Sequence, residues 1–138
     1  MGGRAIFVLE DEPAVRVVLK DALESVGYEV RDFGDGQAAL DQVDHTVPDL
    51  ILLDMRMPRM DGFKFLSALR RKPNAKTIPV IIVSGLGDEL LQAIDARAAE
   101  ELGVAGIFAK PFDVPTLLRY VGSVIARESR PGAPPAKS

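Results

Sequence analysis

The sequence predicts a single α/β domain in which helices cover both faces of a parallel five-stranded sheet. Five short strand-like segments alternate with five segments of helical spacing along the 138 residues. Most of the strand-like segments are apolar throughout, which is typical of strands buried on both faces of a parallel sheet. Hydrophobic residues make up 47% of the chain, enough to fill the core of such a domain.

The predicted strands are residues 5–9, 28–33, 50–53, 80–83 and 106–109. The second segment mixes apolar with charged residues, which indicates a strand at an edge of the sheet. Because crossovers between parallel strands are right-handed, few topologies remain. The order 2-1-3-4-5 places the mixed segment on an edge. We therefore predict a flavodoxin-like (βα)5 three-layer sandwich.

Apolar residues at helical spacing predict the helices between these strands. Gly27 and Gly103 are suited to follow the ends of the first and fourth helices. Asp61 and Asp113 are suited to cap the starts of the third and fifth. A shorter second helix is predicted over residues 36–43. The residues predicted to face inward are Val15, Leu19, Ala22, Leu23, Val26, Phe63, Leu66, Leu69, Leu90, Leu91, Ile94, Ala98, Leu102, Leu117, Leu118, Val121 and Ile125.

Composition narrows the classes of function. The chain has no cysteine, which excludes disulfides, thiolate nucleophiles and cysteine metal sites and fits a reducing cytoplasm. A net charge of −3 gives no sign of attraction to nucleic acid or to an anionic membrane, so we expect no direct contact with either. We expect one domain over residues 1–127, followed by a Pro-rich disordered tail or linker over 128–138.

Polar residues follow the predicted strands where a parallel sheet places its ligands, beyond the carboxyl ends of the strands. Glu10 and Asp11 follow the first strand, and Asp54 follows the third. Ser84 follows the fourth strand, and Lys110 follows the fifth. The sequence therefore predicts that three carboxylates, a hydroxyl and an amine converge on one edge of the sheet.

Charge determines what such a cluster can bind. Neighbouring carboxylates repel one another, and a hard divalent cation relieves that repulsion. Oxygen ligands without histidine or cysteine favour Mg²⁺, with Mn²⁺ as an alternative. Lys110 adds a positive charge opposite the acids, so a phosphoryl group fits between the cation and the ammonium. The hydroxyl of Ser84 could then donate a hydrogen bond to a phosphoryl oxygen.

Phosphoryl transfer onto the chain needs one carboxylate to act as nucleophile. Asp54 is the best candidate because it ends a central strand, between the acidic pair and Lys110. Positioning and charge neutralisation would then supply most of the rate.

Four motifs at the strand ends resemble those of response-regulator receiver domains (CheY-like) of two-component signalling. In this chain they read Phe7-Val8-Leu9-Glu10-Asp11-Glu12-Pro13, Leu52-Leu53-Asp54-Met55-Arg56-Met57-Pro58 with Asp61-Gly62 after it, Val83-Ser84-Gly85, and Lys110-Pro111-Phe112. Each motif alone is weak, since acidic helix starts and Ser-Gly turns are common. Four in the right order, in a resemblance that covers residues 4–126, make a strong signal.

The resemblance implies a role for each matching residue. It makes Asp54 the phosphoacceptor, Ser84 the switch hydroxyl and Lys110 the phosphoryl-binding lysine. It also implies a cis peptide bond between Lys110 and Pro111. The implied Mg²⁺ ligands are Glu10, Asp11, Asp54 and the backbone carbonyl of Arg56.

The resemblance also implies partners. Receivers take a phosphoryl group from the phosphohistidine of a histidine kinase or phosphotransfer protein and later hydrolyse it. They signal by phosphorylation-dependent binding to an output protein or domain, and homodimers are a family tendency. The chain would thus be a phosphoacceptor that promotes its own phosphorylation and dephosphorylation, rather than an enzyme with a separate substrate.

Two features depart from the family pattern. Receivers often carry an aromatic residue three positions before the lysine, where this chain has Ile107. Phe108 is adjacent, but alternation along a strand directs it to the other face. The stretch from Ser84 to Lys110 is also about one helical turn longer than in most receivers, so we expect an extended fourth helix or an extended loop beginning Gly85-Leu86-Gly87.

Two alternative functions use the same residues. A degenerate receiver would bind partners without phosphorylation, although every residue needed for phosphorylation is present. A Mg²⁺-dependent phosphohydrolase would form the same aspartyl phosphate. Haloacid-dehalogenase-like enzymes of that kind carry a second acid two residues after the nucleophile, where this chain has Arg56, so this alternative is disfavoured.

Overall fold

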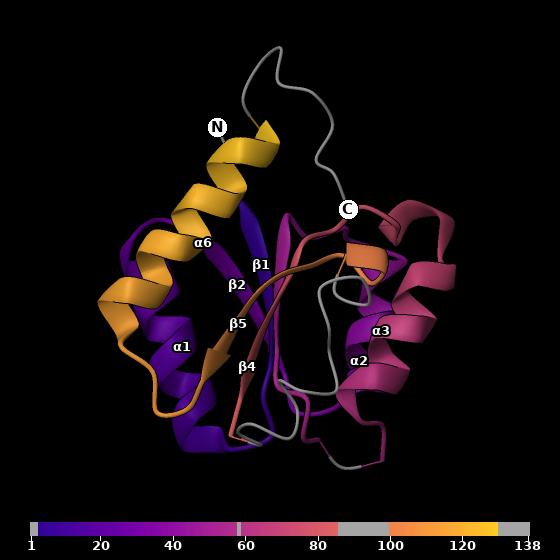
Figure 1. The fold of residues 1–138 in the computed structure, drawn as a ribbon, viewed down its shortest axis with the longest axis horizontal. Helices are drawn as coiled ribbons and strands as arrows, with labels where there is room; N and C mark the ends of the chain where they lie inside the picture. The colour runs from indigo at the N-terminus through magenta and orange to yellow at the C-terminus, as the bar shows by residue number, and fades with distance from the viewer. Residues whose placement is uncertain (1–2, 58, 86–99, 130–138) are drawn as a thin grey trace.

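The computed structural model describes residues 3–57, 59–85 and 100–129 (Figure 1). Three predictions fall outside this range. They concern the loop after Gly85, the part of the fourth helix that carries Leu90, Leu91, Ile94 and Ala98, and the Pro-rich tail from residue 130 onwards.

The five strands pair in parallel in the order β2-β1-β3-β4-β5, which confirms the predicted flavodoxin-like topology. The charged strand β2 lies at one edge and β5 at the other. Strands β1, β3 and β4 form the centre, where almost every side chain is buried. The strands span Ala5–Leu9 (β1), Glu29–Phe33 (β2), Leu50–Leu53 (β3), Val80–Ser84 (β4) and Val104–Ala109 (β5).

Three predicted strand boundaries are wrong. Strand β4 includes Ser84, one residue beyond its predicted end. Strand β2 begins at Glu29 rather than at Tyr28, because the N–H of Tyr28 binds the carbonyl of Leu23 at the end of the preceding helix. Strand β5 begins at Val104, two residues before the predicted start, with a register shift in its pairing to β4 between Val80 and Ile81.

Helices form a layer on each face of the sheet (Figure 1). Helices α1 (Pro13–Ser25) and α6 (Val114–Ser129) cover one face, and α2 (Gly36–Val43) and α3 (Gly62–Arg71) cover the other. A short 3-10 turn (Pro73–Ala75) follows α3. Helix α6 extends two residues past the predicted end of the domain. Within the described ranges, no helix combines the length and apolar character needed to cross a bilayer.

The predicted helix ends are confirmed where the structure describes them. The Asp61 carboxylate accepts the N–H of Lys64 at 2.9 Å, and Asp113 accepts the N–H of Thr116 at the same distance. Such caps satisfy donors that the first helical turn leaves unpaired. Gly27 and Gly103 adopt φ angles of 99° and 71°, which side chains disfavour.

Two residues predicted to face inward are exposed. Val26 is 54% exposed because it lies beyond the last turn of α1, as its C-cap. Phe63 is 39% exposed, whereas Phe65 is completely buried. Residues two apart on a helix lie on nearly opposite faces, so only one of these rings can pack against the sheet.

At the amino end of the sheet, the Arg70 side chain is a hydrogen-bond donor to several main-chain carbonyls. It binds the carbonyls of Ala75 (2.7 Å), Ile78 (2.7 Å), Leu102 (2.8 Å) and Gly103 (3.3 Å). Burial lowers the pKa of Arg70. The guanidinium thus joins the end of α3 to the starts of β4 and β5.

We expect Arg70→Met to lower the free energy of unfolding by about 3 kcal/mol, because it leaves several partly buried carbonyls without a donor. Urea denaturation measures the change, and Arg71→Met at the neighbouring exposed position is the control. An equal loss in both variants would contradict the assigned role of Arg70.

Candidate functional site

The sheet itself positions the residues of the site. Glu10, Asp54 and Lys110 each directly follow a strand, where their main-chain N–H groups still take part in the parallel ladder. Their side chains are therefore fixed by a rigid element rather than by a loop. The ladder bonds beyond the strands run from the N–H of Glu10 to Phe33 (3.0 Å), from Asp54 to Leu9 (2.9 Å) and from Lys110 to Ser84 (2.9 Å).

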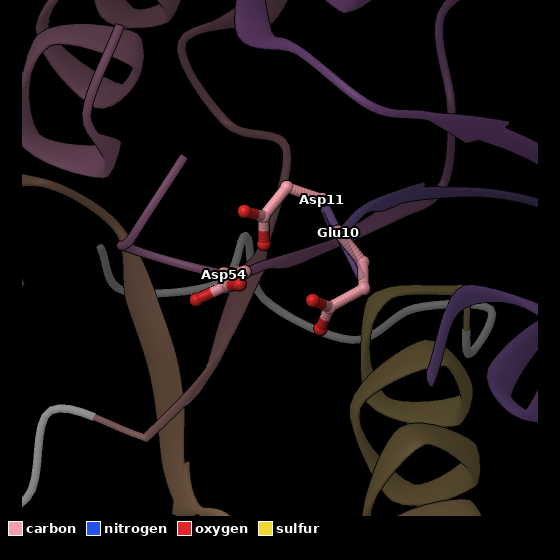
Figure 2. Close-up of side chains that lie close together, drawn as sticks. All are labelled: Glu10, Asp11 and Asp54. Atoms are coloured by element: carbon pink, nitrogen blue, oxygen red, sulfur yellow. The ribbon is translucent and has the colours of Figure 1, made fainter. Parts of the chain in front are cut away.

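Three carboxylates meet at this edge, as predicted. Carboxylate oxygens of Glu10, Asp11 and Asp54 lie within 4.8 Å of one another. Figure 2 shows the three side chains gathered where β1 and β3 end. Glu10 is 1% and Asp54 3% exposed, whereas Asp11 is exposed. The cluster therefore combines two buried acids with one that faces solvent.

The ammonium of Lys110 lies among these acids. Its Nζ is 2.7 Å from Oε1 of Glu10, 3.4 Å from Oδ2 of Asp54 and 3.4 Å from Oε1 of Glu12. Burial lowers the pKa of Lys110, but close contact with Glu10 and the charge of Asp54 outweigh burial, so the net shift is upward. Glu12 had no predicted role, and its place directly after Asp11 is the only sequence signal for it.

Asp54 is held differently at each oxygen. Its Oδ1 accepts the main-chain N–H of Arg56 at 3.0 Å, and its Oδ2 faces Lys110. Burial raises the pKa of Asp54 to about 7, and the charge of Glu10 adds to this shift. The Arg56 N–H and Lys110 oppose it without cancelling it. In the absence of metal, the charged form of Asp54 is therefore destabilised relative to the protonated form.

The remaining predicted residues flank this cluster. Ser84 is buried at the end of β4, and its main-chain carbonyl accepts the N–H of Lys110. The Lys110–Pro111 bond is cis, as predicted. Arg56 is exposed and directs its main-chain N–H to Asp54. A metal-binding role for its carbonyl stays a prediction.

Ile107 and Phe108 lie on opposite faces of β5, as alternation predicts. Ile107 packs against the core beneath α2 and α3, and Phe108 packs against the core beneath α1 and α6. The Phe108 ring contacts that of Tyr120, with 5.4 Å between centroids. An aliphatic side chain therefore lies on the face of β5 that packs against α2 and α3.

The donor set fits a small hard dication. All candidate side-chain ligands are carboxylate oxygens, and they are close enough to share one ion. Two of them are buried, and the partly buried Lys110 ammonium lies 2.7 Å from Glu10 and 3.4 Å from Asp54, where it offsets part of their charge. Mg²⁺ commonly binds one or two carboxylates and keeps several waters, which suits a cluster with one solvent-facing member.

Comparison with known proteins places the chain in a family. Residues 6–122 match the response regulator receiver domain. The cyclic di-GMP phosphodiesterase response regulator RpfG of Xanthomonas campestris is 38% identical over 111 residues, which cover 79% of this chain but 28% of RpfG. The sporulation initiation phosphotransferase F of Bacillus subtilis is 36% identical over 83% of this chain and 87% of its own length.

Solved structures agree with the sequence comparison. The receiver domain of the sensor histidine kinase PA1611 of Pseudomonas aeruginosa, which has a magnesium ion coordinated in its active-site cleft, superposes with a TM-score of 0.77. It is 30% identical, and the match covers 91% of this chain and 99% of that domain. The shared fold, the strand-end acids and the family match lead to one conclusion: the chain belongs to the response regulator receiver domain family.

Proposed function

We propose that Asp54 accepts a phosphoryl group from the phosphohistidine of a histidine kinase or phosphotransfer protein, in a Mg²⁺-dependent reaction. One observation carries this proposal. The buried Asp54 carboxylate has one oxygen held by the Arg56 N–H, while the other faces the Lys110 ammonium beside the acidic pair. Such a carboxylate is oriented for attack, and positive charge is in place where phosphoryl charge would lie.

The chain's residues have distinct parts in the transfer. Oδ2 of Asp54 attacks phosphorus while the bond from phosphorus to the histidine nitrogen breaks, and that nitrogen keeps the electron pair and takes a proton from water. Lys110 and the Ser84 hydroxyl donate hydrogen bonds to the phosphoryl oxygens. Glu10, Asp11, Asp54 and the Arg56 carbonyl would hold Mg²⁺, which would neutralise charge on the carboxylates and on the phosphoryl oxygens.

The proposal extends to signalling. The phosphorylated chain would bind an output protein or domain until water attacks the acyl phosphate and restores Asp54. The residues up to the end of α6 at Ser129 would act as the receiver, and the Pro-rich residues after them as a tail or linker. A phosphohistidine made from ATP also implies a cytoplasmic location.

Acetyl phosphate tests the chemistry without a kinase. Incubation with Mg²⁺ should add one phosphoryl group to the intact protein, detected by mass spectrometry as an acid-stable, base-labile adduct. Borohydride reduction of the acyl phosphate should mark Asp54 in peptide maps, and EDTA should prevent the addition. A folded, metal-binding protein that takes up no phosphoryl group would favour the degenerate-receiver alternative.

A further inference from the structure

Arg16 of α1 lies against the main chain that carries the acidic pair. Its Nη1 donates a hydrogen bond to the carbonyl oxygen of Glu10 at 2.9 Å. Its Nε lies 3.3 Å from Oδ2 of Asp32, the penultimate residue of β2. The Arg16 side chain is only 25% exposed, so it is held between the β1–α1 turn and the neighbouring edge strand.

The carbonyl of Glu10 controls where Asp11 points. A peptide unit is planar, so the oxygen of Glu10 and the nitrogen and Cα of Asp11 move together. On its other side, the N–H of Glu10 is fixed by the carbonyl of Phe33 at 3.0 Å. Asp11 is exposed and has little packing to hold its side chain. The direction in which its carboxylate leaves the chain is therefore set by the main chain that Arg16 binds.

Gly34 provides the space that this arrangement needs. A Cβ at Gly34 would lie 2.7 Å from Nη1 of Arg16. The φ angle of Gly34 is outside the left-handed region, so its backbone conformation does not itself require glycine. The position instead leaves room for the guanidinium.

We propose that Arg16 is a positioning residue for the metal site, acting through the Glu10–Asp11 peptide to aim the Asp11 carboxylate at the cation. The inference rests on the proposed function, since it assumes that the acidic cluster binds a divalent cation. Arg16 is not a ligand, and it carries the same sign of charge as the ion. Its contribution would come from the hydrogen bond to Glu10 and not from attraction.

Because Arg16 and the cation are both positively charged, the proposal can be tested against a purely electrostatic role. If Arg16 acted only through its charge, removing that charge would strengthen cation binding. If it positions Asp11, removing its hydrogen bond should weaken cation binding. Loss of a residue that orients a metal ligand typically costs about 10- to 100-fold in affinity. The two explanations therefore predict changes in opposite directions.

The experiment measures Mn²⁺ binding by electron paramagnetic resonance, which counts the free ion directly. We expect Arg16→Gln to raise Kd about 10-fold. Gly34→Ala keeps every charge and meets only the end of a flexible side chain, so the protein should fold with Arg16 displaced. We expect it to raise Kd about 3-fold, and the double variant should show less than the summed effect because both act through one contact.

Arg31→Gln, at an exposed position of β2, is the matched control and should leave Kd unchanged or lower it. An unchanged or lower Kd in both Arg16→Gln and Gly34→Ala would overturn the inference, even if urea denaturation shows lower stability. Wild-type protein that binds no Mn²⁺ would overturn the proposed function as well. Wild-type binding with unaffected variants would remove the role of Arg16 alone.

Discussion

Asp54→Asn is expected to abolish phosphoryl incorporation and to raise the free energy of unfolding of the metal-free protein by about 2 kcal/mol near neutral pH. The amide cannot act as the nucleophile, so acceptance is lost. Stability rises because the substitution removes a buried negative charge that Glu10 repels. The full linkage value would be larger, but the neighbouring Asp11 is exposed, so we expect solvent to screen the cluster and to reduce the effect.

The increase in stability caused by Asp54→Asn should itself increase with pH. The pKa of Asp54 is raised from 3.8 to about 7 in the folded protein, so folding disfavours the charged form. Below pH 3.8 the group is protonated in both states, and wild type and Asp54→Asn should differ little. The stability advantage of the variant should grow as pH rises from 3.8 and reach its full size above pH 7.

Urea denaturation in EDTA at several pH values measures this effect. Saturating Mg²⁺ should shrink the difference, because a dication stabilises the carboxylate that the variant lacks. Asp21→Asn, at an exposed position of α1, is the control and should change stability little at any pH. Destabilisation by Asp54→Asn, or phosphoryl incorporation that survives it, would contradict the assigned role.

Lys110→Gln should have the opposite effect on stability. Removing the ammonium leaves Glu10 and Asp54 buried without compensation, which we expect to lower the free energy of unfolding of the metal-free protein by about 3 kcal/mol. Phosphoryl uptake from acetyl phosphate should slow by about 100-fold, because a charge that would stabilise the transferring group is lost.

Measurements with and without Mg²⁺ distinguish the role of Lys110 in stability from its role in phosphoryl uptake. The dication should restore most of the lost stability, since it neutralises the same carboxylates, but it should not restore the rate of uptake. Lys64→Gln, at an exposed position of α3, serves as the control for loss of a lysine. If Lys110→Gln accepts phosphate at the wild-type rate, the ammonium does not act on the phosphoryl group.

Much of the fold followed from periodicity together with the right-handed crossover rule. The charged run of β2 indicated an edge strand, which the structure confirms, but the apolar run of β5 gave no sign that this strand lies at the other edge. Phe63 was predicted to face inward, but the buried ring is Phe65. Each ring lies about one helical turn before an inward-facing leucine, Leu66 or Leu69, so spacing alone did not separate them. Periodicity also missed the start of β5, where pairing with β4 decides which residues join the sheet.

The site was predictable to the extent that strand ends determine it. Asp11, Asp54 and Lys110 converge because parallel strands end at one edge, which sequence order reveals. The contacts of Arg16 and Arg70 were not predictable in this way. They depend on how far a long side chain reaches across several elements, and no local pattern encodes that distance.

Strand β5 connects the amino end of the sheet, where Arg70 binds main-chain carbonyls, to the carboxyl end, where the acidic cluster lies. Its start lies beside Gly103, whose carbonyl is bound by Arg70, and its end leads into Lys110. If the Lys110 ammonium shifts toward a bound anion, the six residues of β5 must take up the displacement against a fixed start. Ile107 and Phe108 pack against the helices on opposite faces of the sheet. Twisting of this edge strand would therefore change the packing on both faces at once.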